Sequence, residues 1–151
     1  MQWLRAFAQK VVAALLGDYS PYFIYRWTPG EPSNDGQNPD GCAVRPIEAG
    51  DLAGVAPTLQ EQADYLGDES TGFGGFLDGH LAGVCFYWFG ERYKRRGFWP
   101  LETNEAKLVQ IIVPPESRGR GVAPQLIRAS ALAMSQAGFS ALYARIWHSN
   151  T

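Results

Sequence analysis

The sequence predicts an α/β domain in which β-strands and helices share one hydrophobic core. Three observations support this fold class. Five apolar segments of strand length occur after residue 41, an Asp78-Gly79 pair separates two of them, and two longer segments have helical periodicity. With 151 residues, 46% of them hydrophobic, the chain is long enough to bury a core of its own.

Residues 1–41 are expected to form an appendage to this domain. Apolar residues recur at helical spacing between Trp3 and Leu15, which predicts an amphipathic helix ending at Gly17. A short aromatic strand over 22–27 follows it, and the Pro- and Gly-rich stretch 28–41 is typical of a linker. Membrane-surface contact by the helix is disfavoured because its polar face has few charges.

The main domain, 42–151, is expected to begin with a strand over 42–47. Pro46 places this strand at a sheet edge, because proline donates no hydrogen bond to a ladder. Residues 51–66 are predicted to form a helix, with Asp51 as its N-cap and Gly67 as its stop.

Two strands, 73–77 and 80–89, flank Asp78-Gly79, which is a strong signal for a two-residue hairpin turn. The connection 90–104 carries four basic residues among aromatic ones, which indicates either a solvated loop or a site for an anionic acceptor. A strand at 106–113, a helix at 122–137 and a last strand at 142–147 complete the predicted elements.

Composition excludes several classes of function. A net charge of −2 disfavours nucleic acid as a partner, since phosphate neutralisation needs clustered Lys and Arg. Cys42 and Cys85 are too few for a disulfide framework and lack metal-ligand spacing, so no metal is expected. Reduced cysteines and the lack of a secretory signal pattern indicate a cytoplasmic protein.

The most informative segment is residues 108–123, where an apolar strand runs into a glycine-containing loop and then directly into a helix. Glycines allow close backbone approach to an anion, and a helix start offers N–H groups with a positive dipole end. Arg118 and Arg120 add positive charge. The pattern lacks the Lys-Ser/Thr of a Walker loop and the last glycine of a Rossmann fingerprint. It predicts a pyrophosphate cradle, with a tight turn bearing solvated arginines as the alternative.

Arg118, Gly121 and Ala123 match the pattern Q/R-x-x-G-x-G/A, so this segment resembles motif A of the GNAT acetyltransferases. The resemblance to that family covers roughly residues 42–150. The resemblance implies a mixed, mostly antiparallel central sheet flanked by helices, and acetyl-coenzyme A bound where strands 106–113 and 142–147 splay apart. The backbone of the first strand would hold the pantetheine arm, and the loop would hold the pyrophosphate. The implied cofactor residues are Ile111, Ile112, Val113, Arg118, Gly119, Arg120, Gly121, Val122, Ala123 and Asn150.

The implied reaction is direct transfer of an acetyl group to a primary amine of a small molecule or peptide, which requires a base. Glu105 lies thirteen residues before Arg118, where some family members place a catalytic glutamate; the alternative is a solvated carboxylate. His148 is a second candidate.

Two other functions stay open. The fold could bind coenzyme A without catalysis, or it could use another acyl-coenzyme A, with Phe86, Tyr87 and Trp88 lining a longer acyl pocket. The family domain continues with a helix and strands after the last strand found here, so the C-terminal part of the fold is expected to be missing. Strand 142–147 would then keep an unpaired edge. We expect the natural polypeptide to be longer; the alternatives are cover by a second copy, as a homodimer, or by the segment 1–27.

Overall fold

The computed structural model describes residues 22–30, 41–96 and 99–147. The predicted N-terminal helix, residues 31–40 of the predicted linker, and the site candidates His148 and Asn150 lie outside these ranges. The chain divides into two compact units, one spanning Tyr25–Ala144 and one formed by Met1–Ile24 with Arg145–Thr151. The larger unit contains both of the hydrophobic clusters found in the described ranges.

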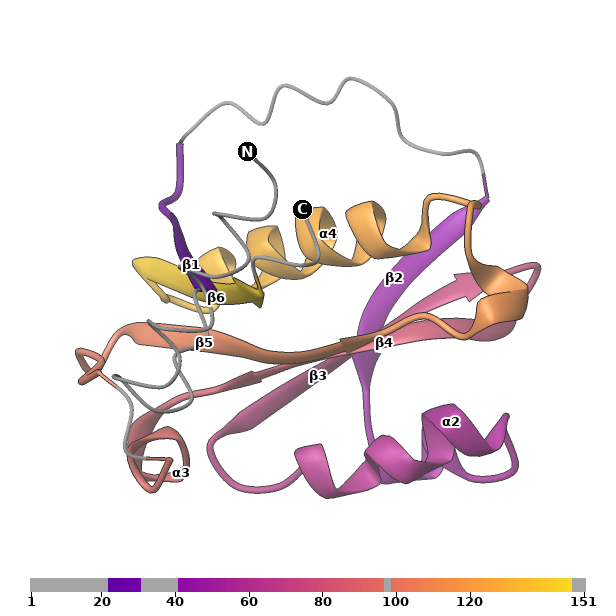
Figure 1. Ribbon diagram of the computed structural model, residues 1–151, viewed down its shortest axis with the longest axis horizontal. Helices are drawn as coiled ribbons and strands as arrows, with labels where there is room; N and C mark the ends of the chain where they lie inside the picture. Colours follow the sequence, from indigo (N-terminus) through magenta and orange to yellow (C-terminus); the bar gives the residue numbers. More distant parts are fainter. Residues whose placement is uncertain (1–21, 31–40, 97–98, 148–151) are drawn as a thin grey trace, which may run out of the picture. The chain divides into compact units, whose positions relative to one another are not determined.

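The described strands form a six-stranded sheet in the order β1-β6-β5-β4-β3-β2 (Figure 1). From β2 to β5 each neighbouring pair is antiparallel, whereas β5 and β6 run parallel. The predicted mixed, mostly antiparallel sheet is therefore confirmed. The strands are β1 (Tyr22–Trp27), β2 (Cys42–Ile47), β3 (Ser70–Leu77), β4 (His80–Trp88), β5 (Glu105–Ile112) and β6 (Ala141–Trp147).

The predicted hairpin is confirmed at the β3–β4 connection. Leu77 pairs with His80, and the two residues between them have positive φ, 51° at Asp78 and 78° at Gly79. A two-residue turn with both φ values positive follows the right-handed twist of the strands, and Asp-Gly adopts it readily. β2 is the last strand at one end of the sheet, so Pro46 lies on an edge strand as predicted.

Alternating side chains of β4 divide the core into two layers. Cys85 and Tyr87 point to the face covered by α4 (Val122–Gln136), whereas Val84 and Phe86 point to the opposite face. Three short helices cover that second face: η1 (Ala49–Leu52), α2 (Pro57–Gln60) and η2 (Glu61–Tyr65). Figure 1 shows α4 and α2 on opposite sides of the sheet. This packing fixes which side chains of the strands reach each surface.

The single helix predicted over 51–66 is wrong. Gly54 has a φ of 71°, and Pro57 begins a new helix, so the segment is three short turns of helix instead of one rod. Two leucines explain the break, because Leu52 and Leu59 are both only 1% exposed beneath the sheet. Burying each contributes roughly 1.5–3 kcal/mol, more than the few hydrogen bonds of a continuous helix would add at this site.

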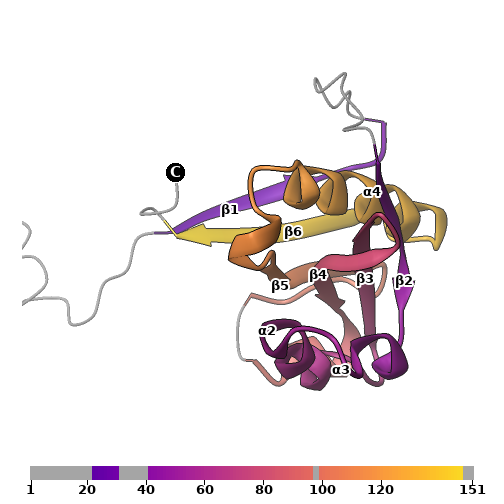
Figure 2. The same ribbon diagram turned by 90° about the vertical axis from the view of Figure 1, so that its right-hand side faces the viewer.

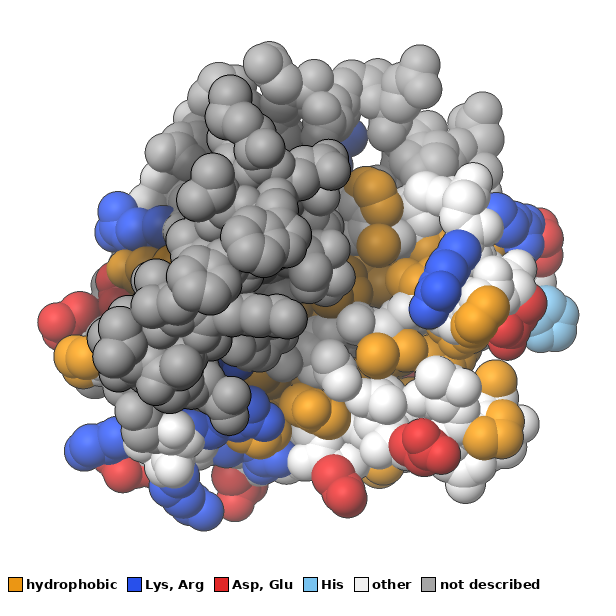
Figure 3. All heavy atoms as spheres, in the orientation of Figure 1, with side chains coloured by type: hydrophobic (Ala, Val, Ile, Leu, Met, Phe, Trp, Pro, Cys, Tyr) orange, Lys and Arg blue, Asp and Glu red, His pale blue; other side chains and the backbone are white. Residues whose placement is uncertain are grey.

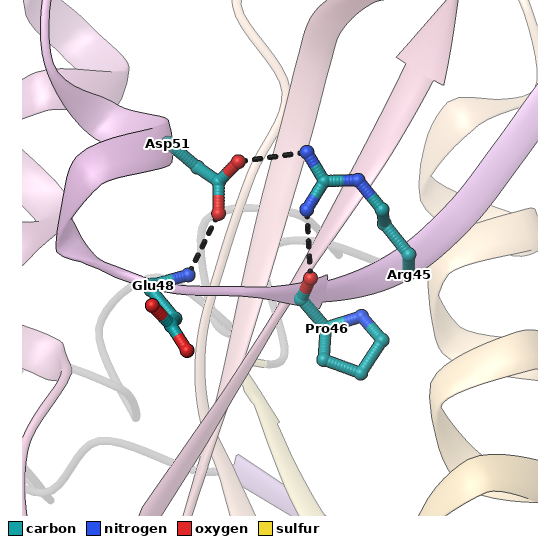
Figure 4. Close-up of polar contacts among 4 residues, drawn as sticks. All are labelled: Arg45, Pro46, Glu48 and Asp51. Atoms are coloured by element: carbon teal, nitrogen blue, oxygen red, sulfur yellow. Dashed lines mark hydrogen bonds and ion pairs between the residues drawn. The ribbon is translucent and has the colours of Figure 1, made fainter.

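Asp51 is not the N-cap of a helix, as the sequence suggested, but the third residue of η1, whose N-cap is Glu48. Its carboxylate accepts one hydrogen bond from the Arg45 guanidinium at 2.7 Å and another from the Glu48 N–H at 2.9 Å (Figure 4). Arg45 also donates to the carbonyl of Pro46. The bond from Arg45, and then that from Glu48, hold the pKa of Asp51 below its ordinary value.

β1 lies next to β6 in the sheet (Figure 2). Within the larger unit, Arg26 of β1 donates a hydrogen bond from Nε to the Tyr143 hydroxyl of β6 at 3.1 Å. Residues 22–27 of the N-terminal segment therefore lie beside β6. No helix of the described residues is long and apolar enough to cross a membrane.

Candidate functional site

β5 carries the apolar end of the candidate site. Its antiparallel register with β4 continues to Ile112, and within the larger unit its parallel register with β6 pairs Glu105–Leu108 with Ala141–Ala144. Pro114 and Pro115 then end the strand and begin η3 (Pro115–Ser117). The last residues of β5 thus lie at the start of the glycine-containing loop.

The glycine loop turns the chain from η3 into α4. Gly119 and Gly121 each have a φ of 73°, a conformation that glycine adopts without the steric cost paid by other residues. Gly121 is the N-cap of α4 and makes no side-chain capping bond. Because proline occupies the third helical position, the N–H groups of Val122 and Ala123 are those that the helix start can offer to an anion.

Two arginines flank this loop but are held differently. The Nε of Arg118 donates to the Val113 carbonyl at 3.1 Å, which bends the side chain back along the end of β5. Arg120 forms an exposed ion pair with Asp78 of the β3–β4 hairpin, at 3.6 Å. Exposed pairs of this kind contribute little and exchange readily. Arg118 is therefore the better placed of the two to line a binding site.

A cavity of about 390 Å³ opens between the end of β5, the loop and α2. Its lining residues are Thr58, Ile111, Ile112, Val113, Pro114, Pro115, Arg118 and Ala123. Figure 3 shows hydrophobic side chains among charged ones on the right of this face, where the β5–α4 loop and α2 lie in Figure 1. The structure thus brings five predicted cofactor residues to one cavity. The sequence did not suggest Thr58, because nothing local predicts that α2 reaches β5.

The other predicted loop residues do not line the cavity. The side chain of Val122 is 2% exposed and packs in the core, so only its backbone can face a ligand. A second cavity of about 420 Å³ lies between β2, the end of η2 and the start of β3, and none of the predicted site residues lines it. We assign the site to the smaller cavity, because it adjoins a helix N-terminus and a guanidinium.

Hydrogen bonds of Gln62 and Gln110 connect two sides of the 390 Å³ cavity. Gln110 of β5 donates from Nε2 to the Gln62 Oε1 at 3.1 Å, and Gln62 donates to the Thr58 carbonyl at 3.0 Å. Gln62 is 9% exposed, so these bonds satisfy an amide that is nearly out of water. They tie the α2 side of the cavity to the strand on its other side.

Glu105 lies at the other end of β5. Ile111 is six positions further along the strand, which corresponds to about 20 Å at the usual rise per residue. Both carboxylate oxygens are engaged: Oε1 accepts from the Tyr143 hydroxyl and Oε2 from the Glu102 N–H, each at 3.1 Å. Glu105 is partly buried, and its carboxylate is held by two hydrogen bonds. Sequence reasoning missed Tyr143, which follows it by 38 residues.

A lysine and several aromatic side chains contact one another near the Glu105 end of β5. Lys107 is 4% exposed, and its Nζ lies 4.9 Å from the ring centroid of Trp99 and 5.7 Å from that of Tyr93 in α3 (Gly90–Lys94). Trp99 also contacts Tyr143 edge-on, at 6.1 Å between centroids. These contacts connect β5 and β6 to the 90–104 connection, and Tyr143 links them to Glu105.

The connection 90–104 does not present its basic residues as a uniform solvated loop. Arg92 donates to the carbonyls of Asp64 and Leu66, at 2.8 and 3.1 Å, and lies over the ring of Trp88. These bonds hold the end of η2 against α3. Arg92 therefore has a structural role, which leaves fewer cations on this connection to recognise an anionic acceptor.

The aromatic residues of β4 pack in the core and do not line the cavity. Phe86 is fully buried and stacks on Tyr65, and the Tyr87 hydroxyl bonds to Ser130 at 2.9 Å. Trp88 donates to the Tyr65 carbonyl. Nothing in these contacts favours a longer acyl pocket. Within the described ranges, no group of three or more His, Cys, Asp or Glu could hold a metal ion.

Cys42 and Cys85 are both buried and unlinked by a disulfide. Burial raises the pKa of the Cys85 thiol to about 12, and it also raises that of Cys42. A thiol that stays protonated at neutral pH is a poor nucleophile. Neither cysteine is therefore suited to carry an acyl group.

Comparison with one solved structure shows a shared fold. A ribosomal-protein-alanine N-acetyltransferase from Brucella melitensis biovar Abortus 2308 has a TM-score of 0.52 and 19% identity, covering 69% of this chain and 78% of that one. An aminoglycoside acetyltransferase from an uncultured soil metagenomic sample has a TM-score of 0.48 and 14% identity, covering 68% and 76%. No curated protein matches the chain by sequence.

The family comparison is consistent with the geometry. The model of the Acetyltransferase (GNAT) family matches residues 13–151, which includes the glycine loop, the cavity and Glu105. The match also takes in β1, which lies outside the resemblance found from motifs alone. The chain therefore belongs to the GNAT family of acetyltransferases.

Proposed function

We propose that this protein transfers an acetyl group from acetyl-coenzyme A to a primary amine by direct attack within a ternary complex. The observation that carries the proposal is the 390 Å³ cavity, which joins an apolar strand end to an uncapped helix start and a guanidinium. Bound acetyl-coenzyme A would supply the acetyl group as an activated thioester.

The residues at the cavity fit the two parts of such a ligand. The N–H groups of Val122 and Ala123, the helix dipole and Arg118 suit a pyrophosphate. The backbone of Ile111–Val113 suits a pantetheine amide chain, which can hydrogen-bond to a strand as another strand does. Arg118 would have to release the Val113 carbonyl for that carbonyl to accept from the ligand.

Glu105 is the proposed base. An arm that starts at the loop and follows β5 would bring the acetyl group toward the Glu105 end of the strand. The Glu105 carboxylate would take the proton of the attacking amine there, directly or through one bridging water, which requires the amine to bind within hydrogen-bond reach of the carboxylate or of that water. His148 and Asn150 stay predictions for the base and for a cofactor contact.

The first experiment measures binding and turnover by the purified protein. Acetyl-coenzyme A at about 100 times its dissociation constant should raise the free energy of unfolding by about 2.7 kcal/mol, visible as an increase in melting temperature. A coenzyme-A-release assay across amines, amino sugars, polyamines and peptide N-termini should then identify the acceptor. Folded protein that shows neither a thermal shift nor coenzyme A release would refute the proposal.

The second experiment tests the base. Glu105→Gln should lower kcat at least ~10²-fold and leave acetyl-coenzyme A affinity nearly unchanged, because the amide cannot accept the proton. Gln keeps the size of the side chain, and its single amide oxygen can accept one of the two hydrogen bonds, from Tyr143 or from Glu102. Turnover equal to the wild type would assign the proton to another group.

A further inference from the structure

We propose that Tyr143, held by Arg26, is the positioning residue that orients the Glu105 carboxylate toward the acceptor amine. This inference rests on the proposed function, in which Glu105 takes the proton of the amine. It adds to that function a residue of β6 and a residue of β1, neither of which belongs to the glycine loop or the cavity.

The direction of the two hydrogen bonds follows from the chemistry of the three side chains. A guanidinium has only donors, so the Arg26 Nε must donate to the Tyr143 oxygen, at 3.1 Å. The single hydroxyl proton of Tyr143 is then directed at Glu105 Oε1, also at 3.1 Å. The two hydrogen bonds therefore point in the same direction, from the Arg26 guanidinium through the Tyr143 hydroxyl to the Glu105 carboxylate.

The Tyr143 ring is held from two further sides. The Arg26 guanidinium carbon lies 6.0 Å from its centroid, and Trp99 contacts it edge-on. With the Glu102 N–H on the other carboxylate oxygen, the Glu105 side chain is restricted to one orientation. A base restricted in this way loses little conformational freedom when the amine binds, and that lowers the barrier of the step it assists.

Glu105 and Tyr143 lie on two neighbouring parallel strands, β5 and β6, near the first residues of each. Glu105 pairs in register with Ala141, two residues before Tyr143, so both side chains lie at the same end of the β5–β6 pair. Lys107 is directly opposite Tyr143 in that register, so the strand pairing fixes the place of Tyr143 beside β5.

The experiment compares Tyr143→Phe with Glu105→Gln and the double variant. Tyr143→Phe should lower kcat about tenfold with the KM for acetyl-coenzyme A unchanged, since only the orientation of the base is lost. In the Glu105→Gln background the same change should have no further effect, because the carboxylate it orients is gone. A kcat within twofold of the wild type, or full additivity of the two losses, would overturn the proposal.

A matched control separates positioning from stability. Tyr87→Phe removes another tyrosine hydroxyl that hydrogen-bonds, here to Ser130 on the α4 face. It should lower the melting temperature and leave kcat unchanged. If Tyr143→Phe does not fold, Arg26→Leu on the exposed side of β1 gives the same test, with a several-fold loss of kcat expected and an unchanged kcat contradicting the proposal.

The outcomes distinguish this inference from the proposed function. A folded wild type that releases no coenzyme A with any amine refutes the function, and the inference with it. An active wild type with a fully active Glu105→Gln refutes the role of Glu105. An active wild type, an impaired Glu105→Gln and an unimpaired Tyr143→Phe refute the inference alone.

Discussion

Gly83 of β4 lies close to the first residue of α4, and replacing it with alanine should displace the adjoining glycine loop. A Cβ at this position would lie 2.9 Å from Val122 Cγ1, 3.0 Å from Val113 Cγ2 and 3.1 Å from the Ile112 carbonyl oxygen. The first two atoms belong to the residues that begin α4 and line the cavity. Val122 is 2% exposed in a closely packed core, so we expect the added methyl group to displace the start of the helix.

The expected cost follows from overpacking. Inserting a methyl group into a closely packed core costs about 1–3 kcal/mol. For a chain of this size each kcal/mol corresponds to roughly 2–4 °C in melting temperature, so Gly83→Ala should melt roughly 2–12 °C below the wild type. Because the displaced residues hold the loop, acetyl-coenzyme A affinity measured by calorimetry well below the melting temperature should also fall at least several-fold.

Gly50 provides the matched control. It lies in η1, on the other face of the sheet, and a Cβ there would meet no atom within 4 Å. Gly50→Ala should therefore be neutral or slightly stabilising, because alanine restricts the unfolded chain. Two results would refute the reasoning: a Gly83→Ala protein with wild-type melting temperature and affinity, or a Gly50→Ala protein destabilised to the same extent.

Two further predictions concern the loop and the η1 turn. Gly121→Val should reduce acetyl-coenzyme A affinity, measured by calorimetry, more than Arg120→Ala does. Valine disfavours the φ of 73° at position 121, whereas Arg120 makes only an exposed ion pair. The opposite order would contradict a pyrophosphate site formed by the loop backbone. The lowered pKa of Asp51 stabilises the fold above its unfolded value of about 3.9, and this contribution is lost as pH falls through the folded value. Urea titrations should therefore show wild type and Asp51→Asn converging in stability below about pH 4, and a constant difference would exclude the Arg45 pair as its cause.

The sequence by itself determined the elements whose causes are local. The hairpin follows from adjacent residues that accept positive φ, and α4 ends at Gln136, before Gly138, which has a φ of 101°. The strand, glycine loop and helix start that form most of the cavity are also contiguous, so their juxtaposition needs no distant contact. For the same reason the motif identified the family before any tertiary contact was considered.

Local rules failed where burial decided the conformation. The segment 51–66 has helical periodicity, yet Gly54 and Pro57 are placed so that Leu52 and Leu59 can both pack beneath the sheet. The gain from burying two leucines exceeds the gain from continuing a short helix. Gly54 and Pro57 are residues that interrupt a helix, and they mark the two ends of the break in the sequence.

Only the tertiary structure decided which residues meet from distant parts of the chain. Tyr143 reaches Glu105 across 38 residues and Arg26 across 117, and Thr58 meets the end of β5 from the opposite wall of the cavity. Such contacts depend on strand order and register, and a register shift of one residue would turn Tyr143 to the other face of the sheet. No local pattern encodes that choice, because it is the packing of both sheet faces at once that selects the register.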